Sequence, residues 1–328
     1  MIDTVDTTGL ICGFRLHAEE PAAFLAWETV DKFRDALEGP VWLHFNLADT
    51  RAQKWIETWE RLPEVARERF LDEDPHIRLQ PAEKGVVGVL GDVLYEFDAD
   101  PESLGTLRFY ADEGLLLTGR VHPLKAIDQL RREMRGGQPI GTTFELVVHL
   151  VEDLADMFSQ VVVEQGELVD DIEDGILKEH WHLQSGELGR LRRLFARLRR
   201  HVGASRHALS QLLYFPPGWR GGLDQSPLHV AIERLEGVVQ DFESIQERAR
   251  LLQEEIATQR GESTSRNLYV LSILTAILLP ITLITGIFGM NVGGLPWVES
   301  PNGFGWVMFV MLLTGLVTFI ILAWRRFF

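Results

Sequence analysis

Two uncharged apolar runs near the C-terminus constrain the fold of this chain more than any other feature. They cover residues 268–290 and 306–324, which are 23 and 19 residues long, and about 20 apolar residues suffice for a helix to cross a bilayer. The charged residues that follow Arg266 are Glu299, Arg325 and Arg326. A buried helical hairpin in a soluble core is the weaker alternative, because such helices usually carry a polar stripe. The sequence therefore predicts two transmembrane helices.

Basic residues beside the two runs predict their orientation. Arg260 and Arg266 precede the first run, Arg325 and Arg326 follow the second, and residues 292–305 contain neither Lys nor Arg. Because cytoplasmic segments next to spans are enriched in Lys and Arg, we expect both termini to face the cytoplasm. The N-terminus has no basic start and no long apolar run, so it does not resemble a signal peptide.

Composition places the rest of the chain among folded, cytosolic domains that do not bind nucleic acid. The 328 residues are 46% hydrophobic, which is ordinary for a folded protein, and 32 basic against 48 acidic side chains give a formal charge of -16. This sign opposes binding to a phosphate backbone. The single cysteine, Cys12, cannot form an intramolecular disulfide, and no Cys-x-x-Cys pair is present to bind a metal.

Residues 1–140 have the pattern of a cytoplasmic α/β domain. Strand-like runs cover residues 10–16, 41–47, 86–97, 107–111 and 115–121. Helical patterns cover residues 50–61, after a possible cap at Asp49, and 124–134. In the strand-like run at 41–47, Val41, Leu43 and Phe45 should share one face of the sheet. No phosphate-binding loop or nucleophile elbow is visible, so we do not expect an enzyme.

Residues 141–227 have the pattern of an antiparallel helical hairpin, with helices over residues 142–181 and 187–213. The first helix carries the acidic residues Glu164, Glu167, Asp170, Asp171, Glu173 and Asp174. The second carries the basic residues Arg190, Arg192, Arg193, Arg197, Arg199 and Arg200. Folding back should bring the opposite charges together, which is a better interpretation of the basic run than RNA binding.

A stalk helix is predicted over residues 228–267, with apolar residues spaced mostly by alternating fours and threes. They are Leu228, Ile232, Leu235, Val239, Phe242, Ile245, Ala249, Leu252 and Ile256. No proline interrupts the pattern before Pro280, so the stalk should continue into the first span. A single helix over residues 228–290 would be about 95 Å long.

One face of the first span combines hydroxyl groups with leucines. At about 100° per residue, six positions fall within an arc of roughly 80°. They are Leu268, Leu271, Thr275, Leu279, Thr282 and Gly286. In a pore, Thr would offer oxygen atoms and Leu would form constrictions. In an ordinary span, the Thr hydroxyl would donate a hydrogen bond to a carbonyl of the preceding turn, and Gly would allow close helix packing. The face alone favours neither the pore nor the ordinary span.

The end of the first span is more specific. It ends in Gly289, Met290 and Asn291, and Val292, Gly293, Gly294, Leu295 and Pro296 follow. A Gly-Met-Asn sequence at this place, after a long stalk and an acidic α/β domain, resembles the CorA superfamily of divalent metal-ion transporters. Gly-Gly-Leu-Pro after Asn291, and Trp-Leu-His-Phe-Asn at residues 42–46, are most similar to its ZntB zinc-transporter branch.

The resemblance implies a funnel-shaped homopentamer in the bacterial inner membrane that conducts Zn²⁺, with proton coupling as a further expectation and no resident cofactor. Its inner ring would be residues 268–290, lined by the hydroxyl and leucine face, and residues 306–324 would lie outside this ring. Gly289, Met290 and Asn291 would form the external mouth, where the first span meets the external loop of residues 291–305. Glu299 would attract cations to this mouth. Residues 325–328 would be a short cytoplasmic tail.

The residue types of the pore do not identify the metal. Zn²⁺ prefers His nitrogen and Cys sulfur, but no His follows His229 and no Cys follows Cys12. Either the pore passes a hydrated ion along oxygen atoms, or the selectivity for the metal resides elsewhere. His180 and His182 point about 200° apart on a helix and cannot share an ion, and His44 is interpreted as a strand residue with a local hydrogen bond. The location of any bound metal is unknown from the sequence.

Two alternatives stay open at this point. A magnesium, cobalt or nickel channel of the CorA type would have the same architecture. A non-conducting coiled-coil scaffold or sensor, anchored by its C-terminal hairpin, would have the same two spans. It stays open because two helices in one chain cannot enclose a polar path without an oligomer.

Overall fold

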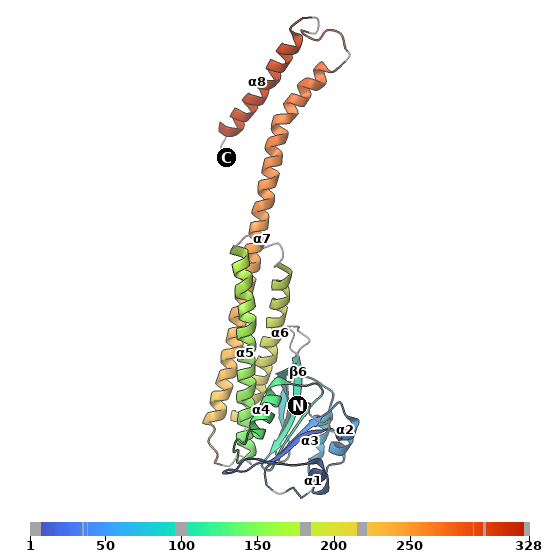
Figure 1. Cartoon of the computed structure of the whole chain (residues 1–328), viewed down its shortest axis with the longest axis vertical. Helices are drawn as coiled ribbons and strands as arrows, with labels where there is room; N and C mark the ends of the chain where they lie inside the picture. The colour runs from blue at the N-terminus through green and yellow to red at the C-terminus, as the bar shows by residue number, and fades with distance from the viewer. Residues whose placement is uncertain are drawn as a thin grey trace. The chain divides into compact units, whose positions relative to one another are not determined.

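The computed structural model describes residues 8–34, 36–37, 39–95, 104–177, 185–214, 222–290, 292–297 and 300–324 (Figure 1). The chain divides into two compact units, Met1–Gln253 and Glu254–Phe328. The element order is that of an α/β domain followed by long helices, as the sequence predicts.

Seven strands form one mixed sheet in the first unit, in the order β2-β1-β3-β7-β6-β5-β4. Their bounds are β1 Leu10–Arg15, β2 Ala23–Phe24, β3 Val41–Asn46, β4 Arg78–Pro81, β5 Val86–Val93, β6 Leu104–Asp112 and β7 Leu115–Arg120. β3 and β7 are parallel, and the other neighbouring pairs are antiparallel. The parallel pair lies at the centre of the sheet, where strands are covered on both faces.

Side chains on both faces of β3 are buried. Val41, Leu43 and Phe45 share one hydrophobic cluster with Trp55 and Trp59, which confirms the predicted face. This cluster includes residues of three short helices, α1 Trp27–Lys32, α2 Thr50–Glu57 and α3 Glu64–Leu71. The alternate residues Trp42 and His44 are also fully buried. Each buried aliphatic or aromatic side chain contributes about 1.5–3 kcal/mol, so β3 anchors the core.

Several short elements and boundaries differ from the sequence prediction. The predicted strand 86–97 ends at Val93, and the predicted helix 50–61 ends at Glu57. The hydroxyl of Thr58 donates to the carbonyl of Lys54 at 3.0 Å, which satisfies a carbonyl at the helix end. The sequence prediction also missed α1, α3, β2 and β4, because these short segments show neither a clear apolar alternation nor a clear helical periodicity.

A buried carboxylate fixes the start of α4 (Lys125–Arg135) on the sheet. Asp92, on β5, accepts hydrogen bonds from the backbone N–H groups of Ala126 and Ile127 at 3.2 and 3.3 Å, and from Val93 at 2.6 Å. No side chain within α4 caps its N-terminus, since Leu124 occupies the cap position. Burial raises the pKa of Asp92 to about 6, while these hydrogen bonds lower it. The strand therefore supplies the acceptor that the helix itself lacks.

Three long helices follow, α5 Thr143–Leu177, α6 Ser185–Tyr214 and α7 Ser226–Phe288. In the first unit they lie side by side (Figure 1). Most predicted stalk positions are buried, namely Leu228, Ile232, Leu235, Phe242, Ala249, Leu252 and Ile256, while Val239 and Ile245 are half-buried. The heptad seam is therefore the inner face of a helical bundle over the part of α7 in the first unit.

Close backbone approach joins α6 to β5. The imidazole Nε2 of His201 lies 2.9 Å from the carbonyl oxygen of Gly105, and the Ser205 hydroxyl accepts from the N–H of Gly91 at 2.9 Å. A Cβ atom on Gly91 would lie 2.2 Å from Cδ2 of His201. Only glycine therefore fits at this point of β5 without displacing the histidine ring.

Ion pairs in the bundle differ from the predicted direct pairing of the hairpin helices, because α7 supplies the partners. Arg199 and Arg206 of α6 pair with Glu243 and Glu236 of α7 at 3.1 and 2.8 Å. Arg248 of α7 pairs with Asp170 at 2.5 Å and with Glu173, both on α5. The second charge of each ion pair thus comes from a helix that the hairpin prediction did not include.

Candidate functional site: a hydroxyl and leucine face on α7

The second unit contains the end of α7 and the helix α8 (Gly303–Trp324). Both helices are long and apolar enough to cross a membrane, and none of either apolar window is buried. Gly315 of α8 lies against Ile281 of α7, since a Cβ atom on this glycine would lie 3.4 Å from the isoleucine Cδ1. The two spans therefore pack through a small residue, as transmembrane helices commonly do.

The predicted hydroxyl and leucine face of α7 lies away from α8. The half-buried residues of the span are Tyr269, Ile273, Ala276, Ile277, Pro280, Ile281, Ile284 and Phe288. At about 100° per residue their mean direction is about 170° from the predicted face. Leu268, Leu271 and Leu279 are 59%, 58% and 62% exposed. One chain thus leaves this face without a protein neighbour among the described residues of the second unit.

The threonine hydroxyls on this face have a defined hydrogen-bonding role. The hydroxyl of Thr275 donates to the carbonyl of Leu271 at 2.8 Å, and that of Thr282 donates to Leu278 at 2.9 Å. These are the bonds expected of an ordinary span. Because a hydroxyl has one proton and two lone pairs, each oxygen can still accept a hydrogen bond from a hydrated ion.

A shallow groove marks the middle of this face. It has a volume of about 470 Å³ and is lined by Leu271, Ser272, Thr275, Ala276, Leu279 and Pro280. Pro280 has no N–H, so the carbonyl of Ala276 has no helical donor four residues later. The sequence prediction placed neither residue on the pathway, although a proline inside an apolar span is a readable signal of a free carbonyl. The groove therefore combines hydroxyl and carbonyl oxygens with leucine side chains.

The predicted external mouth is only partly described. The N–H of Gly289 donates to the carbonyl of Thr285 at 2.8 Å and ends the helical pattern, and the Met290 side chain is 50% exposed. Asn291 and Glu299 lie outside the described residues. In the connecting loop, Trp297 stacks on Trp306 with a centroid distance of 6.3 Å.

The histidines and cysteine do not form a metal centre in the described structure. Among these residues, no group of three His, Cys, Asp or Glu side chains is placed to hold a metal ion. His180 and His182 lie outside this part of the chain. Nδ1 of His44 lies 2.8 Å from the Thr118 hydroxyl, which confirms the predicted local hydrogen bond. Burial holds the pKa of His44 well below its usual value, so its imidazole is neutral.

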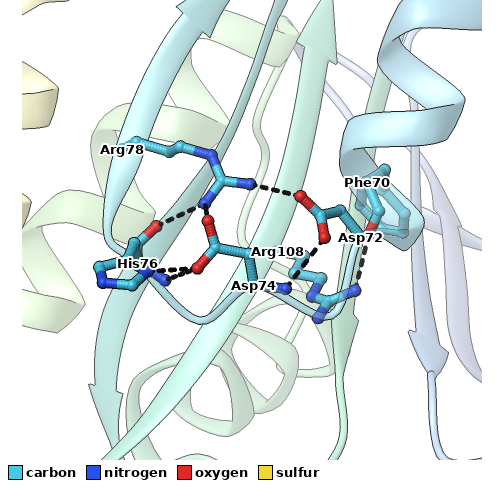
Figure 2. Close-up of polar contacts among 6 residues, drawn as sticks. All are labelled: Phe70, Asp72, Asp74, His76, Arg78 and Arg108. Carbon is cyan, nitrogen blue, oxygen red and sulfur yellow. Dashed lines mark hydrogen bonds and ion pairs between the residues drawn. The ribbon is translucent and has the colours of Figure 1, made fainter.

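An acidic segment before β4 carries its own counter-charge. Figure 2 shows its members and neighbours, Phe70, Asp72, Asp74, His76, Arg78 and Arg108. The Arg78 guanidinium binds Asp72 at 3.0 Å and Asp74 at 2.6 Å. The hydrogen bond from His76 lowers the pKa of Asp74, with a further contribution from the Arg78 charge. These carboxylates are therefore neutralised by an internal cation.

A buried carboxyl on α5 is less well satisfied. Asp153 is 9% exposed, and its Oδ2 atom is buried without a hydrogen-bond partner. Burial raises the pKa of Asp153 to about 8, with further contributions from Glu133, Asp156, Glu152 and Asp92. The surroundings of this group are acidic, and so they favour its protonated form near neutral pH.

Comparison with known proteins identifies the family. The sequence model of the family described as "CorA-like Mg2+ transporter protein" matches residues 38–326. The divalent cation transporter CmaX of Pseudomonas aeruginosa is 30% identical over 324 residues, covering 98% of this chain and 97% of the relative. The zinc transport protein ZntB of Yersinia enterocolitica is 28% identical over 280 residues, or 85% of each chain.

Solved structures agree with this assignment. The structure of full-length CmaX superposes with a TM-score of 0.82 at 27% identity, and covers 99% of both chains. The CorA magnesium transporter of Methanocaldococcus jannaschii has the same fold, with a TM-score of 0.77 at 19% identity over 96% of this chain and 97% of the other. The resemblance seen in Gly289, Met290 and Asn291, and the predicted fold class, are confirmed. The chain therefore belongs to the CorA-like Mg²⁺ transporter family, whose members are divalent-cation transporters in membranes and not enzymes.

Proposed function

We propose that this chain moves Zn²⁺ across the bacterial inner membrane through a pore formed by α7 of five copies. The observation that carries zinc as the cargo is the similarity to zinc transport proteins of the ZntB type in several bacteria. The Gly-Gly-Leu-Pro sequence after Asn291 favours the same branch.

Assembly of several copies follows from the number of spans. Two helices cannot enclose a polar path, because the lipid would meet the polar groups directly. The hydroxyl and leucine face of α7 lies opposite the side that packs on α8. A ring of copies would place this face around a common axis, with α8 outside.

The chemistry of the face suits a cation that keeps its water. Thr275 and Thr282 offer lone pairs while their protons stay on the helix. Rings of Leu271 and Leu279 would form the narrow parts of the path. Asn291 would present amide oxygens at the mouth, and Glu299 would raise the local cation concentration. None of these groups requires Zn²⁺ to lose its whole hydration shell.

Orientation and proton coupling complete the proposal. Both termini would face the cytoplasm, as the Arg residues beside the spans predict. Neither span contains Asp, Glu, His, Lys or Arg between residues 268–290 or 306–324. Protons would therefore move through water, with Glu299 or cytoplasmic carboxylates as the ionisable groups.

A second candidate is transport of Mg²⁺, Co²⁺ or Ni²⁺ by the same pore. The family description and the similarity to CmaX, a divalent cation transporter, favour it. The architecture is common to both candidates, so only the transported ion distinguishes them.

Flux into proteoliposomes that contain the purified protein tests the proposal. We expect Zn²⁺ uptake that a pH gradient increases and that excess Mg²⁺ reduces little. Flux of Mg²⁺, Co²⁺ or Ni²⁺ without Zn²⁺ would assign the chain to the second candidate. A mass measurement that shows five copies, but no flux of any divalent cation, would overturn transport and favour the scaffold.

A further inference from the structure

Two charged stripes on the hairpin helices have the same spacing. On α5, the carboxylates of Glu164, Glu167 and Asp171 are separated by three and four residues. On α6, the guanidinium groups of Arg193, Arg197 and Arg200 are separated by four and three residues. Since the two helices run in opposite directions, the two spacings are complementary. Asp174 and Arg190 continue the pattern by one step on each helix.

The side chains of the acidic stripe, Glu164, Glu167 and Asp171, and of the basic stripe, Arg193, Arg197 and Arg200, are all exposed. In the part of the chain that the structure describes, the observed ion pairs leave all six without a partner, because Asp170, Glu173 and Arg199 are the residues that face α7. The acidic stripe lies about 140° around α5 from its buried face, and the basic stripe about 150° around α6. Val163, beside the acidic stripe, is 61% exposed although it is apolar. Both stripes therefore belong to the outer surface of the bundle.

The ion pairs with α7 show which residues of α5 and α6 lie at the same position along the axis of the helical bundle. We call this position the level of a residue. Asp156 pairs with Arg234 and Asp170 with Arg248, and both partners are 78 positions further along the chain, since 234 minus 156 and 248 minus 170 agree. Arg248 also pairs with Glu173, 75 positions before it, so α5 and α7 are parallel with an offset of 75–78 residues over this length.

The same measure places α6. Arg199 pairs with Glu243, and Arg206, seven residues later, pairs with Glu236, seven residues earlier. α6 and α7 are thus antiparallel. With the offset of 78, each acidic position is level with one basic position, and with the offset of 75 it lies within one helical turn of that level. Glu164 and Arg200 share the level of Phe242, Glu167 and Arg197 that of Ile245, and Asp171 and Arg193 that of Ala249.

We infer that these stripes are a docking surface for a second copy of this chain, with the acidic stripe of one copy against the basic stripe of the next. The inference rests on the assembly of several copies in the proposed function. In a ring whose symmetry axis runs along the bundle, rotation does not change the level of a residue. Charges that are level within one chain are therefore level between neighbouring chains. Three pairs form at each contact, Glu164 with Arg200, Glu167 with Arg197 and Asp171 with Arg193.

The pairing explains a basic stripe on a chain with a formal charge of -16. Whole copies repel one another at this charge, so contacts between them need local complementarity. A surface ion pair contributes little to affinity, and a ladder of three sets register and orientation more than it sets affinity. The apolar Val163 beside the ladder would lose exposed surface in the same contact.

Cross-linking of the full-length protein in membranes tests this contact. In the variant Asp171→Cys/Arg193→Cys, mild oxidation should convert the monomer band on a non-reducing gel into a ladder of linked chains. The matched control, Glu164→Cys/Arg193→Cys, places the thiols seven residues apart in height, or about 10 Å, beyond the reach of a disulfide. The native Cys12 is buried and is common to both variants.

Three results would overturn the inference. They are a disulfide within one chain, free thiols after oxidation, and an equal ladder from the control variant. A charge exchange gives a second measurement. After treatment with a general amine-reactive linker, Asp171→Arg and Arg193→Glu should each lower the yield of cross-linked oligomers of the size that the wild-type protein forms. The variant with both substitutions should restore the wild-type yield. A protein that conducts Zn²⁺ but links within one chain refutes only the ladder, whereas a monomer by mass refutes the assembly itself.

Discussion

The two units of this chain place their apolar side chains in opposite environments. In the first unit, the largest side chains, including Trp42, Trp59 and Phe158, are fully buried within one chain. In the second unit, Leu279 and Leu312 are 62% and 69% exposed. A single chain therefore completes the core of the first unit only. The second unit requires an apolar environment such as lipid, because its apolar surface would not be stable in water.

Polar groups show the same contrast. In the first unit, the buried carboxylate of Asp92 accepts from two N–H groups of a different element, α4, and from the N–H of Val93 on its own strand. In the second unit, Thr275 and Thr282 satisfy their protons with their own helix. Tertiary structure thus supplies the partners in the first case and secondary structure supplies them in the second. Substitutions should reflect this difference.

The largest effect is expected at the end of the first span. Asn291→Ala should abolish cation flux and leave the oligomer intact, because the proposed mouth would lose its amide oxygens. Flux into proteoliposomes, with the mass of the assembly as a check, measures this effect. Asn302→Ala makes the same chemical change in the same loop and should keep normal flux. Normal flux in a correctly assembled Asn291→Ala protein would refute the role of Asn291.

A smaller effect on flux is expected on the pore face. Thr282→Val keeps the shape of the side chain and removes its lone pairs, so we expect flux to fall about tenfold, equivalent to about 1.4 kcal/mol. Thr314→Val on α8 is the matched control, since its hydroxyl also donates to the preceding turn, at 2.7 Å from the carbonyl of Val310. Equal losses in both variants would show that the hydroxyls serve helix structure and not the pathway.

A stability effect is expected where α6 meets the sheet. Gly91→Ala should lower the free energy of unfolding by about 1–3 kcal/mol, because its Cβ would overlap the His201 ring. Thermal unfolding of the full-length protein measures the change. Gly203→Ala on α6 has open space around its Cβ and should instead raise stability by up to about 1 kcal/mol. The same sign in both variants would contradict the proposed contact.

The smallest effect is expected at Asp153 and depends on pH. Burial raises the pKa of Asp153 to about 8 in the folded protein, above the ordinary value of 3.8 for an exposed Asp. The unfolded chain therefore binds fewer protons than the folded one between these values, and stability falls as pH rises through this range. Asp153→Asn removes the cost of ionisation and should raise stability at pH 8, with little change at pH 4. An equal shift in melting temperature at both pH values would exclude this explanation.

Long, periodic segments of this protein were predictable from sequence, and short ones were not. The two spans and α5, α6 and α7 repeat their pattern over many turns, so their existence and approximate ends agree with the structure. α1 and β4 contain six and four residues, which is too few for a period to be visible. The motif ending in Asn291 predicted the family because it stands at the end of a span, a position that apolar length alone defines.

The sequence by itself determined the membrane spans, the α/β character of the cytoplasmic part, the family and the hydroxyl and leucine face of α7. Each depends on spacing along the chain, which is readable without contacts. Only the tertiary structure decided which charges meet. The hairpin helices were expected to neutralise each other, but α7 takes Asp170, Glu173 and Arg199 and leaves a second stripe exposed on each helix. A helix has several faces, and spacing cannot say which of them a third helix will cover.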